Sequence, residues 1–508
     1  MAQSIQETER KYAAPAADDI SWLSELVGAG PVVSLADRGV HELDAVYYDT
    51  EDLRLTSGGA SLRRRTGGTD AGWHLKLPLS GDSREEIRLP LSESDENVPA
   101  DLRELTLSRT RGAPLRPVVR IRSTRSVRDL LDAEGVAVAE VSLDSVRADS
   151  RLVSGLHAMW TEMEVELAEG GDPRLLKQVE KVLRRNGIER ADSPSKVARA
   201  LRETTPAPNG DHLGAGIEPD SAGAHVHAYI ERLVRGLSDL DPAVRRDRPD
   251  AVHKTRTTIR RLRSCLRSCR SVLDRQVTDP VRAELKWLAG ELADERDHEV
   301  LRDRLAAGVT KLPGELVLGP VSARLQVWDA AEQAQARRRT LAALASPRYL
   351  ELLESLTRLL EDPPLRAKAS GRPEKVLTKA IVREHGRLRG RMDRALALPA
   401  GPERDAAVHH ARKAAKRVRY AAEAARPALG KPAKRLGKRM KAVQQISGDH
   451  HDGVVARDVL RDLAIAAHAA GEPNFTWGVL YGEEMASGEA RERQLPEAWR
   501  RARKAKLG

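Results

Sequence analysis

Charged side chains that alternate along short segments are the residues most able to do chemistry in the first half of this chain. Glu7, Glu9 and Lys11 are spaced two residues apart, so a strand would present all three on one face. The same spacing recurs in Arg63 with Arg65, His74 with Lys76, Arg84 with Glu86, Arg120 with Arg122, and Glu162 with Glu164 and Glu166. A period of two predicts that each segment is a strand with one charged face.

Carboxylates crowded on one face indicate a bound cation. Neighbouring like charges repel one another, and a divalent ion with oxygen ligands, Mg²⁺ or Mn²⁺, would relieve that repulsion. The strands that carry mainly Arg and Lys would in turn need an anion with several charges. For any single strand the alternative is a sheet with one solvated face. The whole set favours a site for a metal-bound polyphosphate chain.

Composition and hydrophobic spacing divide the chain into parts. The first part consists of short alternating segments. The later part is rich in Ala, Leu, Arg and Glu, with apolar residues at steps of three and four, which predicts long helices. A Pro- and Gly-rich stretch without hydrophobic periodicity separates them. We therefore expect a multidomain α+β protein with a strand domain at 1–203, a linker at 204–221, a helical domain at 222–485 and a charged tail at 486–508.

The helical part carries basic stripes that occur twice. His253, Arg256, Arg260, Arg263 and Arg267 are three or four residues apart and share one helix face. A second set starts 156 positions later with His409, Arg412, Lys416 and Arg419, and Lys434 and Lys438 follow it. Uncompensated like charges cost about 0.2–0.5 kcal/mol per contact, so we expect an anion to bind them. The repetition predicts two packed helical bundles related by a pseudo-twofold axis.

The overall charge limits the partners. The 508 residues include 86 Lys or Arg and 75 Asp or Glu, a net charge of +11. Residues 1–200 hold 28 basic and 34 acidic side chains, so 201–508 carry a net charge of +17. A basic half suggests a nucleic acid, a lipid surface or a phosphate polymer. The sequence has 7 Trp, 7 Tyr and 1 Phe, which disfavours nucleic acid because single-strand binders stack bases on aromatic rings.

Sequence features of a membrane or secreted protein are absent. No apolar run approaches the ~20 residues of a membrane span, the helices lack an aromatic apolar face, and no secretory signal opens the sequence. Cys265 and Cys269 are the only cysteines, and we expect them to be reduced packing thiols. These observations predict a cytoplasmic protein that does not bind membranes.

An ordered series of motifs runs through the strand domain. It begins with Glu7-Thr8-Glu9-Arg10-Lys11, which reads ExExK, and ends with Ser193-Pro194-Ser195-Lys196. With this series, residues 3–203 resemble the CYTH family, the triphosphate tunnel metalloenzymes. The resemblance implies a closed antiparallel barrel of eight strands with flanking helices and a charged tunnel. Such a barrel binds a linear triphosphate and one or two divalent metals, and it cleaves a phosphoanhydride bond.

The resemblance also implies a role for each matching residue. Metal would bind Glu7, Glu9, Glu164 and Glu166, with Glu140, Asp144 and Glu162 as further candidates. Triphosphate would bind Lys11, Arg63, Arg65, Lys76, Arg84, Arg120, Arg122 and Lys196. Arg84 is expected to pair with Glu86 inside the tunnel. Glu7, Glu9, Lys11, Glu164 and Glu166 would form the catalytic centre, where water attacks the terminal phosphorus in line.

The family includes inorganic triphosphatases, thiamine triphosphatases and adenylyl cyclases. Thiamine needs aromatic stacking and a cyclase needs a pocket for the base, whereas Trp73 has no aromatic neighbour in sequence. We therefore expect inorganic triphosphate to be the substrate, with thiamine triphosphate and ATP as alternatives. A further alternative is a binding protein of polyphosphate granules whose barrel holds phosphate without cleaving it.

The helical part contains a second set of motifs, which are His253-x-x-Arg256 and His409-x-x-Arg412 in the basic stripes and Arg296-Asp297 outside them. With them, residues 222–485 resemble the CHAD family of histidine-containing helical domains. The resemblance implies two four-helix bundles with a basic channel that binds long-chain inorganic polyphosphate. The implied ligands are His253, Arg256, Arg260, Arg263, Arg267, His409, Arg412, Lys416, Arg419, Lys434 and Lys438. The second copy reads His450-His451-Asp452 where the first has Arg296-Asp297, which leaves the role of its aspartate open.

Overall fold

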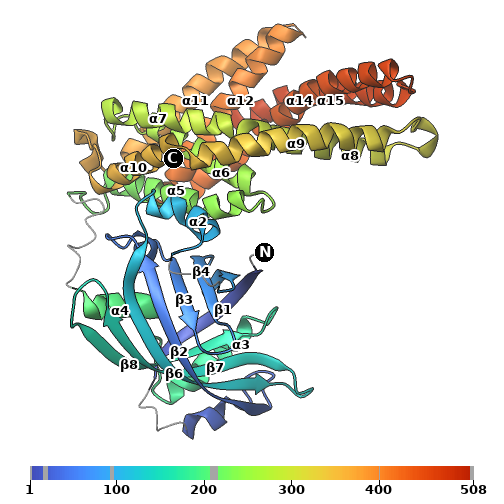
Figure 1. Cartoon of the computed structure of the whole chain (residues 1–508). Helices are drawn as coiled ribbons and strands as arrows, with labels where there is room; N and C mark the ends of the chain where they lie inside the picture. The colour runs from blue at the N-terminus through green and yellow to red at the C-terminus, as the bar shows by residue number, and fades with distance from the viewer. Residues whose placement is uncertain (1–2, 15–20, 92–96, 206–215, 400, 504–508) are drawn as a thin grey trace. The chain divides into compact units, whose positions relative to one another are not determined.

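The computed structural model describes residues 3–14, 21–91, 97–205, 216–399 and 401–503. The chain forms two compact units, Met1–Asp211 and His212–Gly508 (Figure 1). The linker predicted at 204–221 lies largely outside the described residues, because 206–215 are not among them. Each unit is described here by itself.

The first unit is a closed antiparallel barrel, as predicted. Its strands are β1 (Gln3–Ala13), β2 (Ser34–Asp49), β3 (Ser61–Thr66), β4 (Gly72–Pro78), β5 (Ser83–Leu89), β6 (Arg116–Leu131), β7 (Ala137–Ser150) and β8 (His157–Leu167). They follow one another around the wall in the order β1-β5-β4-β3-β2-β6-β7-β8. Closure pairs every strand on both sides, so the barrel presents no open sheet edge.

Short helices cover the outside of this barrel. They are η1 (Ser21–Leu26), α1 (Arg54–Ser57), α2 (Ala100–Thr110) and α3 (Arg174–Arg185). Leu183 of α3 packs with Tyr12 and Val165 on one part of the outer face, and Leu102 of α2 packs with Leu62 and Trp73 on another. Because side chains alternate along a strand, burial of these apolar residues outside turns their charged neighbours inward.

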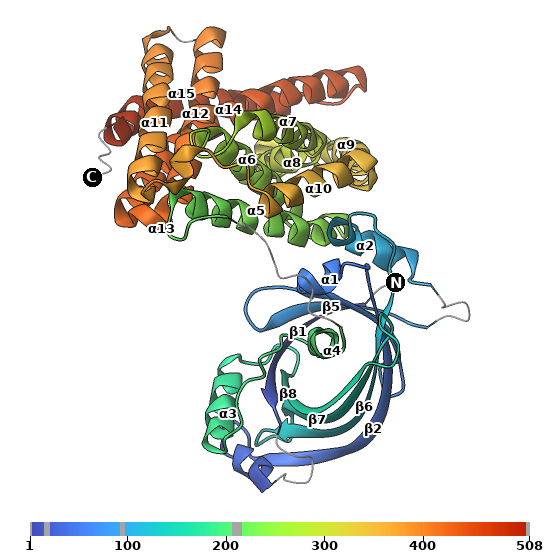
Figure 2. The ribbon, with the colours of Figure 1, turned by 90° about the vertical axis from the view of Figure 1, so that its left-hand side faces the viewer.

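One helix occupies the inside of the barrel. Figure 2 shows α4 (Lys196–Thr204) within the ring of strands. Its residues Val197, Ala200 and Leu201 form an apolar cluster with inward-facing side chains that include Ile121 and Val146. The interior therefore has an apolar part around α4 as well as a charged part.

The second unit is helical, as predicted. Its helices are α5 (Ala222–Arg245), α6 (Ala251–Ser268), α7 (Arg275–Glu291), α8 (Ala293–Lys311), η2 (Gly314–Leu316), α9 (Val321–Ala345), α10 (Pro347–Glu361), η3 (Ala367–Ser370), α11 (Pro373–Ala397), α12 (Pro402–Ala424), α13 (Arg426–Leu429), α14 (Lys431–Ala469) and α15 (Phe475–Arg503). No helix in the described part of the chain is both long and apolar enough to span a membrane.

The helical unit has two apolar cores, and both contain helices from the two sequence copies. The larger core includes Leu262 of α6, Leu285 of α7, Leu388 of α11 and Val418 of α12. The smaller one joins α8 and α9 to α14 and α15, which extend together in Figure 1, through residues such as Leu305 and Trp477. The prediction of tandem four-helix bundles is not confirmed, because neither core belongs to one copy alone.

The prediction of a charged tail at 486–508 is wrong for residues 486–503, which belong to a helix. Helix α15 continues to Arg503, and Leu495, Trp499 and Ala502 are buried in the larger core. These residues are four and three positions apart, so they form an apolar stripe on a helix whose other faces are charged. Residues 504–508 lie outside the described part of the chain.

Candidate functional site

The register of the barrel brings the predicted catalytic residues together. Glu9 lies opposite Glu166 and Lys11 opposite Glu164 across the β1–β8 pair, while Glu7 lies opposite Arg84 across β1–β5. Eight basic and five acidic side chains of the described residues line the resulting cavity: Lys11, Arg63, Arg65, Lys76, Arg84, Arg88, Arg125 and Lys196, with Glu7, Glu9, Asp70, Glu164 and Glu166. The interior of the barrel is therefore a charged tunnel, as predicted.

Three of the carboxylates form a compact group that fits a divalent metal. One oxygen each of Glu7, Glu9 and Glu166 lies within 4.8 Å of the others. Burial raises the pKa of Glu166 to about 7 against the opposing effect of Lys76, and the nearby Glu7 and Glu9 raise it further. An all-oxygen donor set with this mutual repulsion is the kind of site that Mg²⁺ or Mn²⁺ occupies.

A second group of carboxylates contacts cations, as Glu7 does with Lys76 and Glu9 with Lys11. The Nζ atom of Lys196 lies 3.1 Å from Asp144, 2.8 Å from Glu162 and 2.7 Å from Glu164. Arg125 donates to Asp144 and Glu164 at 2.8 and 2.7 Å. Asp144, Glu162 and Glu164, which are predicted metal ligands, hold Lys196 and Arg125 in position in this structure.

The remaining metal candidate, Glu140, lies opposite Glu166 in the β7–β8 register. Burial raises the pKa of Glu140, and Arg125 opposes that shift. Its carboxylate is not part of the three-membered group of Glu7, Glu9 and Glu166.

Six of the eight predicted phosphate ligands line the tunnel, and two do not. Arg120 and Arg122 project from the outer face of β6, where they pair with Asp44 and Asp149 and their side chains are 39% and 49% exposed. Arg125 of the same strand lines the tunnel instead. The prediction failed because the apolar face of β6, with Val119 and Ile121, faces inward onto α4, whereas apolar faces away from α4 face outward.

The pair expected between Arg84 and Glu86 is not formed. Arg84 donates to the carbonyl oxygen of Pro194 at 2.5 Å and lies 3.9 Å from Glu9. Glu86 is 3.0 Å from Nδ1 of His74 and is also paired with Arg88. The second ring nitrogen of His74 lies 2.9 Å from the carbonyl oxygen of Asp70. His74 therefore supports the tunnel wall, since both of its ring nitrogens are engaged.

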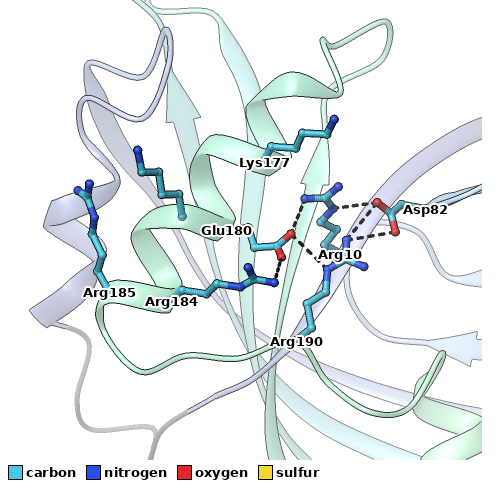
Figure 3. Close-up of a pocket in the computed structure, with 8 residues that line it drawn as sticks. Arg10, Asp82, Lys177, Glu180, Arg184, Arg185 and Arg190 are labelled. Carbon is cyan, nitrogen blue, oxygen red and sulfur yellow. Dashed lines mark hydrogen bonds and ion pairs between the residues drawn. The ribbon is translucent and has the colours of Figure 1, made fainter.

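A separate hollow lies on the outside of the barrel, between β1 and α3 (Figure 3). Arg10 projects outward there and contacts Asp82 at 2.8 Å and Glu180 at 2.6 Å. Arg190 reaches the same two carboxylates at 3.1 and 3.3 Å. In this network the two arginines and the two carboxylates pair with one another and connect β1 to α3. It therefore supports β1, the strand that carries Glu9 and Lys11 on its inner face.

The two basic stripes of the helical unit meet between α6 and α12. Burial lowers the pKa of Lys416 on α12 to about 7, and nearby Arg412 and Arg260 lower it further. Burial likewise lowers the pKa of Arg260 on α6, with Arg256 and Arg412 adding to the effect. Four cations from the two sequence copies thus repel one another in one partly buried place, as expected of a site that binds an anion.

Matched ion pairs hold this cationic cluster. Arg256 contacts Asp297 at 2.8 Å, and Arg412 contacts Asp452 at 3.7 Å. Asp452, whose role the sequence left open, therefore contacts the arginine of the second copy as Asp297 contacts the arginine of the first. The correspondence supports the predicted repeat at the level of single side chains.

The other predicted polyphosphate ligands are spread more widely. His253 lies near Arg260 and Arg296, and burial lowers its pKa. Arg419 donates to Gln444 at 2.9 Å, and the His409 ring lies 6.4 Å from that of His410.

Two further pairs of predicted ligands do not share the surroundings of Lys416. Arg263 and Arg267 are near Arg282, farther along α6. Lys434 and Lys438 are exposed on α14.

Comparisons with known proteins agree with this division. A family model for the CYTH domain matches residues 6–201 and one for the CHAD domain matches 228–461. Two uncharacterized proteins of Mycobacterium tuberculosis are 38% identical over 496 residues, which is 94% of this chain and 93% of theirs. Among solved structures, PptA from Streptomyces chartreusis matches with a TM-score of 0.47 and 23% identity, over 55% of this chain and 99% of that one. The CHAD domain from the plant Ricinus communis matches with a TM-score of 0.44 and 24% identity, over 58% and 96%.

Proposed function

Since the chain belongs to the proteins that join a CYTH domain to a CHAD domain, we propose that its barrel hydrolyses inorganic triphosphate and its helical domain binds inorganic polyphosphate. CYTH domains are triphosphate tunnel enzymes and depend on a metal. The observation that carries the proposal is the tunnel itself, where Glu7, Glu9 and Glu166 converge beside a wall of cations.

The donor set of the tunnel fits the metal that the family requires. Mg²⁺ or Mn²⁺ held by Glu7, Glu9 and Glu166 would neutralise charge on the phosphate oxygens and lower the pKa of a bound water. Lys11, Arg125 and Lys196 bind the non-bridging oxygens of the chain and stabilise charge that develops on them. Asp144, Glu162 and Glu164 fix these cations before substrate arrives, so little reorganisation accompanies binding.

The side chains around the tunnel favour an inorganic substrate over an organic one. Tyr47 is the one aromatic residue among the described side chains that line the cavity, and its hydroxyl lies 3.4 Å from Arg63. Trp73 packs outside the tunnel against Tyr48, with ring centroids 5.0 Å apart. Thiamine or adenine would find no pair of rings for stacking.

A substrate panel tests the assignment. Tripolyphosphate, thiamine triphosphate, ATP and long-chain polyphosphate are compared at equal Mg²⁺ or Mn²⁺ by steady-state phosphate release. We expect the highest kcat/KM for tripolyphosphate. A higher value for thiamine triphosphate or ATP would reassign the substrate, and no turnover of any of the four would favour the granule-binding alternative.

Polyphosphate binding is carried by the cluster of Arg256, Arg260, Arg412 and Lys416. Their replacement by Ala is expected to weaken the binding of long-chain polyphosphate about 10- to 100-fold, because several unscreened charge contacts are lost. Hydrolysis of tripolyphosphate should change less than about twofold. Titration with labelled polyphosphate and the phosphate-release assay measure the two properties.

The matched control for this variant removes the same number of charges from exposed positions of the helical unit: Lys286, Arg338, Lys375 and Lys379. It is expected to weaken polyphosphate binding by a much smaller factor. Equal loss of polyphosphate binding in the two variants would show that binding depends on the total charge of the helical unit and not on this cluster. Equal loss of binding and hydrolysis in the first variant would contradict separate sites.

The depressed pKa of Lys416 predicts that polyphosphate binding depends on pH. With a pKa of about 7 in the free protein, Lys416 loses its proton as the pH rises from 6 to 8. A bound polyanion favours the charged form, so binding takes up a proton and the affinity falls over this range. Lys416→Arg keeps its charge throughout and is expected to flatten the dependence. Parallel pH profiles of wild type and Lys416→Arg, measured at constant ionic strength, would contradict this role.

A further inference from the structure

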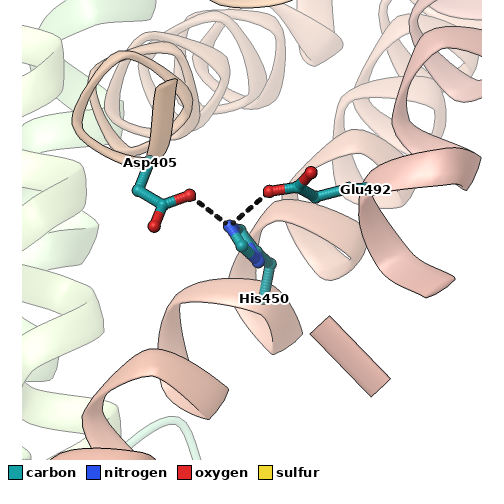
Figure 4. A group of neighbouring side chains, drawn as sticks. All are labelled: Asp405, His450 and Glu492. Carbon is teal, nitrogen blue, oxygen red and sulfur yellow. Dashed lines mark hydrogen bonds and ion pairs between the residues drawn. The ribbon is translucent and has the colours of Figure 1, made fainter. Parts of the chain in front are cut away.

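Three helices of the second unit bring metal-ligating side chains to one point. Asp405 of α12, His450 of α14 and Glu492 of α15 converge there (Figure 4). The Nε2 atom of His450 lies 2.9 Å from Oδ1 of Asp405 and 3.3 Å from Oε1 of Glu492. The three candidate ligand atoms all lie within 4.8 Å of one another.

Hydrogen bonding alone does not account for this arrangement. The Nε2 atom can donate one hydrogen and so can satisfy one of the two carboxylates fully. In the described part of the chain, neither Asp405 nor Glu492 has a Lys or Arg within ion-pair distance. The two negative groups therefore face each other across a single ring nitrogen.

A doubly protonated histidine would also leave a buried donor unpaired. His450 is 8% exposed, and its Nδ1 atom is buried without a hydrogen-bond partner among the described residues. An imidazolium ion would place a charged N–H group at this buried position without an acceptor, which is costly. The neutral tautomer with its proton on Nδ1 leaves the same N–H group unpaired but without a full positive charge, and it has a lone pair at Nε2 that can bind a metal.

We propose that Asp405, His450 and Glu492 bind a divalent transition metal such as Mn²⁺ or Zn²⁺. The ion would neutralise both carboxylates and accept the lone pair of Nε2. A nitrogen ligand with two carboxylate oxygens suits these ions, whereas the tunnel offers carboxylate oxygens alone. Because the ligands come from three helices, the bound metal cross-links α12, α14 and α15 and stabilises the helical unit.

The nitrogen ligand allows metal bound at this site to be distinguished from metal bound in the tunnel, in the intact chain. Pulsed electron paramagnetic resonance of bound Mn²⁺ detects a directly coordinated imidazole nitrogen. We expect nitrogen modulation in wild type and in Glu7→Gln/Glu9→Gln, and its loss in His450→Ala. Absence of the signal in wild type, or its persistence in His450→Ala, would overturn the proposal.

Size-matched variants cover the case in which His450→Ala does not fold. Asp405→Asn and Glu492→Gln are expected to weaken Mn²⁺ or Zn²⁺ binding about tenfold or more each when made in the Glu7→Gln/Glu9→Gln chain. The rise in Tm on adding either metal should diminish in the same variants. Unchanged metal stoichiometry and Tm response in both would show that the three residues form a hydrogen-bonded cluster without a metal. That result would leave the proposed tunnel activity untouched.

Discussion

Glu7→Gln combined with Glu9→Gln is expected to lower kcat/KM for tripolyphosphate by about a thousandfold or more. The change converts two of the three carboxylates that converge in the tunnel into neutral amides, and so removes the charge that would hold a divalent ion against the substrate. Loss of a metal and its Lewis acidity costs several kcal/mol in the transition state, and each 1.36 kcal/mol is about tenfold in rate. Steady-state phosphate release with Mg²⁺ or Mn²⁺ measures the loss.

Two controls separate this effect from general damage to the barrel. Glutamine keeps the size of glutamate, and polyphosphate binding by the helical unit should remain as in wild type. Glu162→Gln alters a carboxylate on β8 that is held by Lys196 at 2.8 Å and by the indole of Trp160 at 2.6 Å. We expect it to reduce activity far less than Glu166→Gln. Equal losses would contradict the assignment of Glu166 to the metal and Glu162 to support.

Arg125→Ala is expected to lower kcat/KM for tripolyphosphate about a hundredfold, whereas Arg122→Ala should leave it within about twofold of wild type. Arg125 lines the tunnel and is fixed by Asp144 and Glu164 at 2.8 and 2.7 Å. Removal of one preorganised donor to a charged transition state costs about 10²–10³ in rate. Arg122 pairs with Asp149 on the outer face and is half exposed.

The two arginines make a matched pair, since they belong to one strand, three residues apart, and differ in the face they occupy. Arg125 also neutralises Asp144, so Arg125→Lys is a useful companion that keeps the charge. We expect partial activity from Arg125→Lys and a melting temperature close to wild type. A larger loss in Arg122→Ala than in Arg125→Ala would contradict the placement of β6.

The barrel and the inward direction of Glu7, Glu9 and Lys11 could be predicted from sequence because strand alternation is a local signal. Glu7, Glu9 and Lys11 alternate with outward side chains such as Tyr12, which is fully buried in the outer core. Burial of that outer face fixes the inward direction of the charges.

The face of β6 could not be predicted in the same way. Its apolar residues Val119 and Ile121 pack on α4, which lies inside the barrel. Arg122 and Arg125 are three residues apart and therefore lie on opposite faces of β6. Only the position of α4 decides which of the two faces the inside of the barrel. The rule that apolar residues face outward in this barrel holds away from α4 and fails beside it.

The cluster of Asp405, His450 and Glu492 gave no local signal. Its members are more than forty residues apart in pairs along the chain and meet only because three helices converge. The last of them lies in the segment predicted to be a charged tail, where the buried Leu495 and Trp499 show that the helix continues into the core. Long-range packing therefore sets both the helix and the cluster.

The most direct measurement is crystallographic. Crystals of the full chain grown with Mn²⁺ and a non-hydrolysable imido analogue of triphosphate are measured near the manganese absorption edge. We predict an anomalous peak within bonding distance of Glu7, Glu9 and Glu166, with the phosphate chain along the tunnel against Lys11, Arg125 and Lys196. Well-occupied Mn²⁺ and analogue bound elsewhere, with the tunnel carboxylates still paired to their own cations, would contradict the central claim.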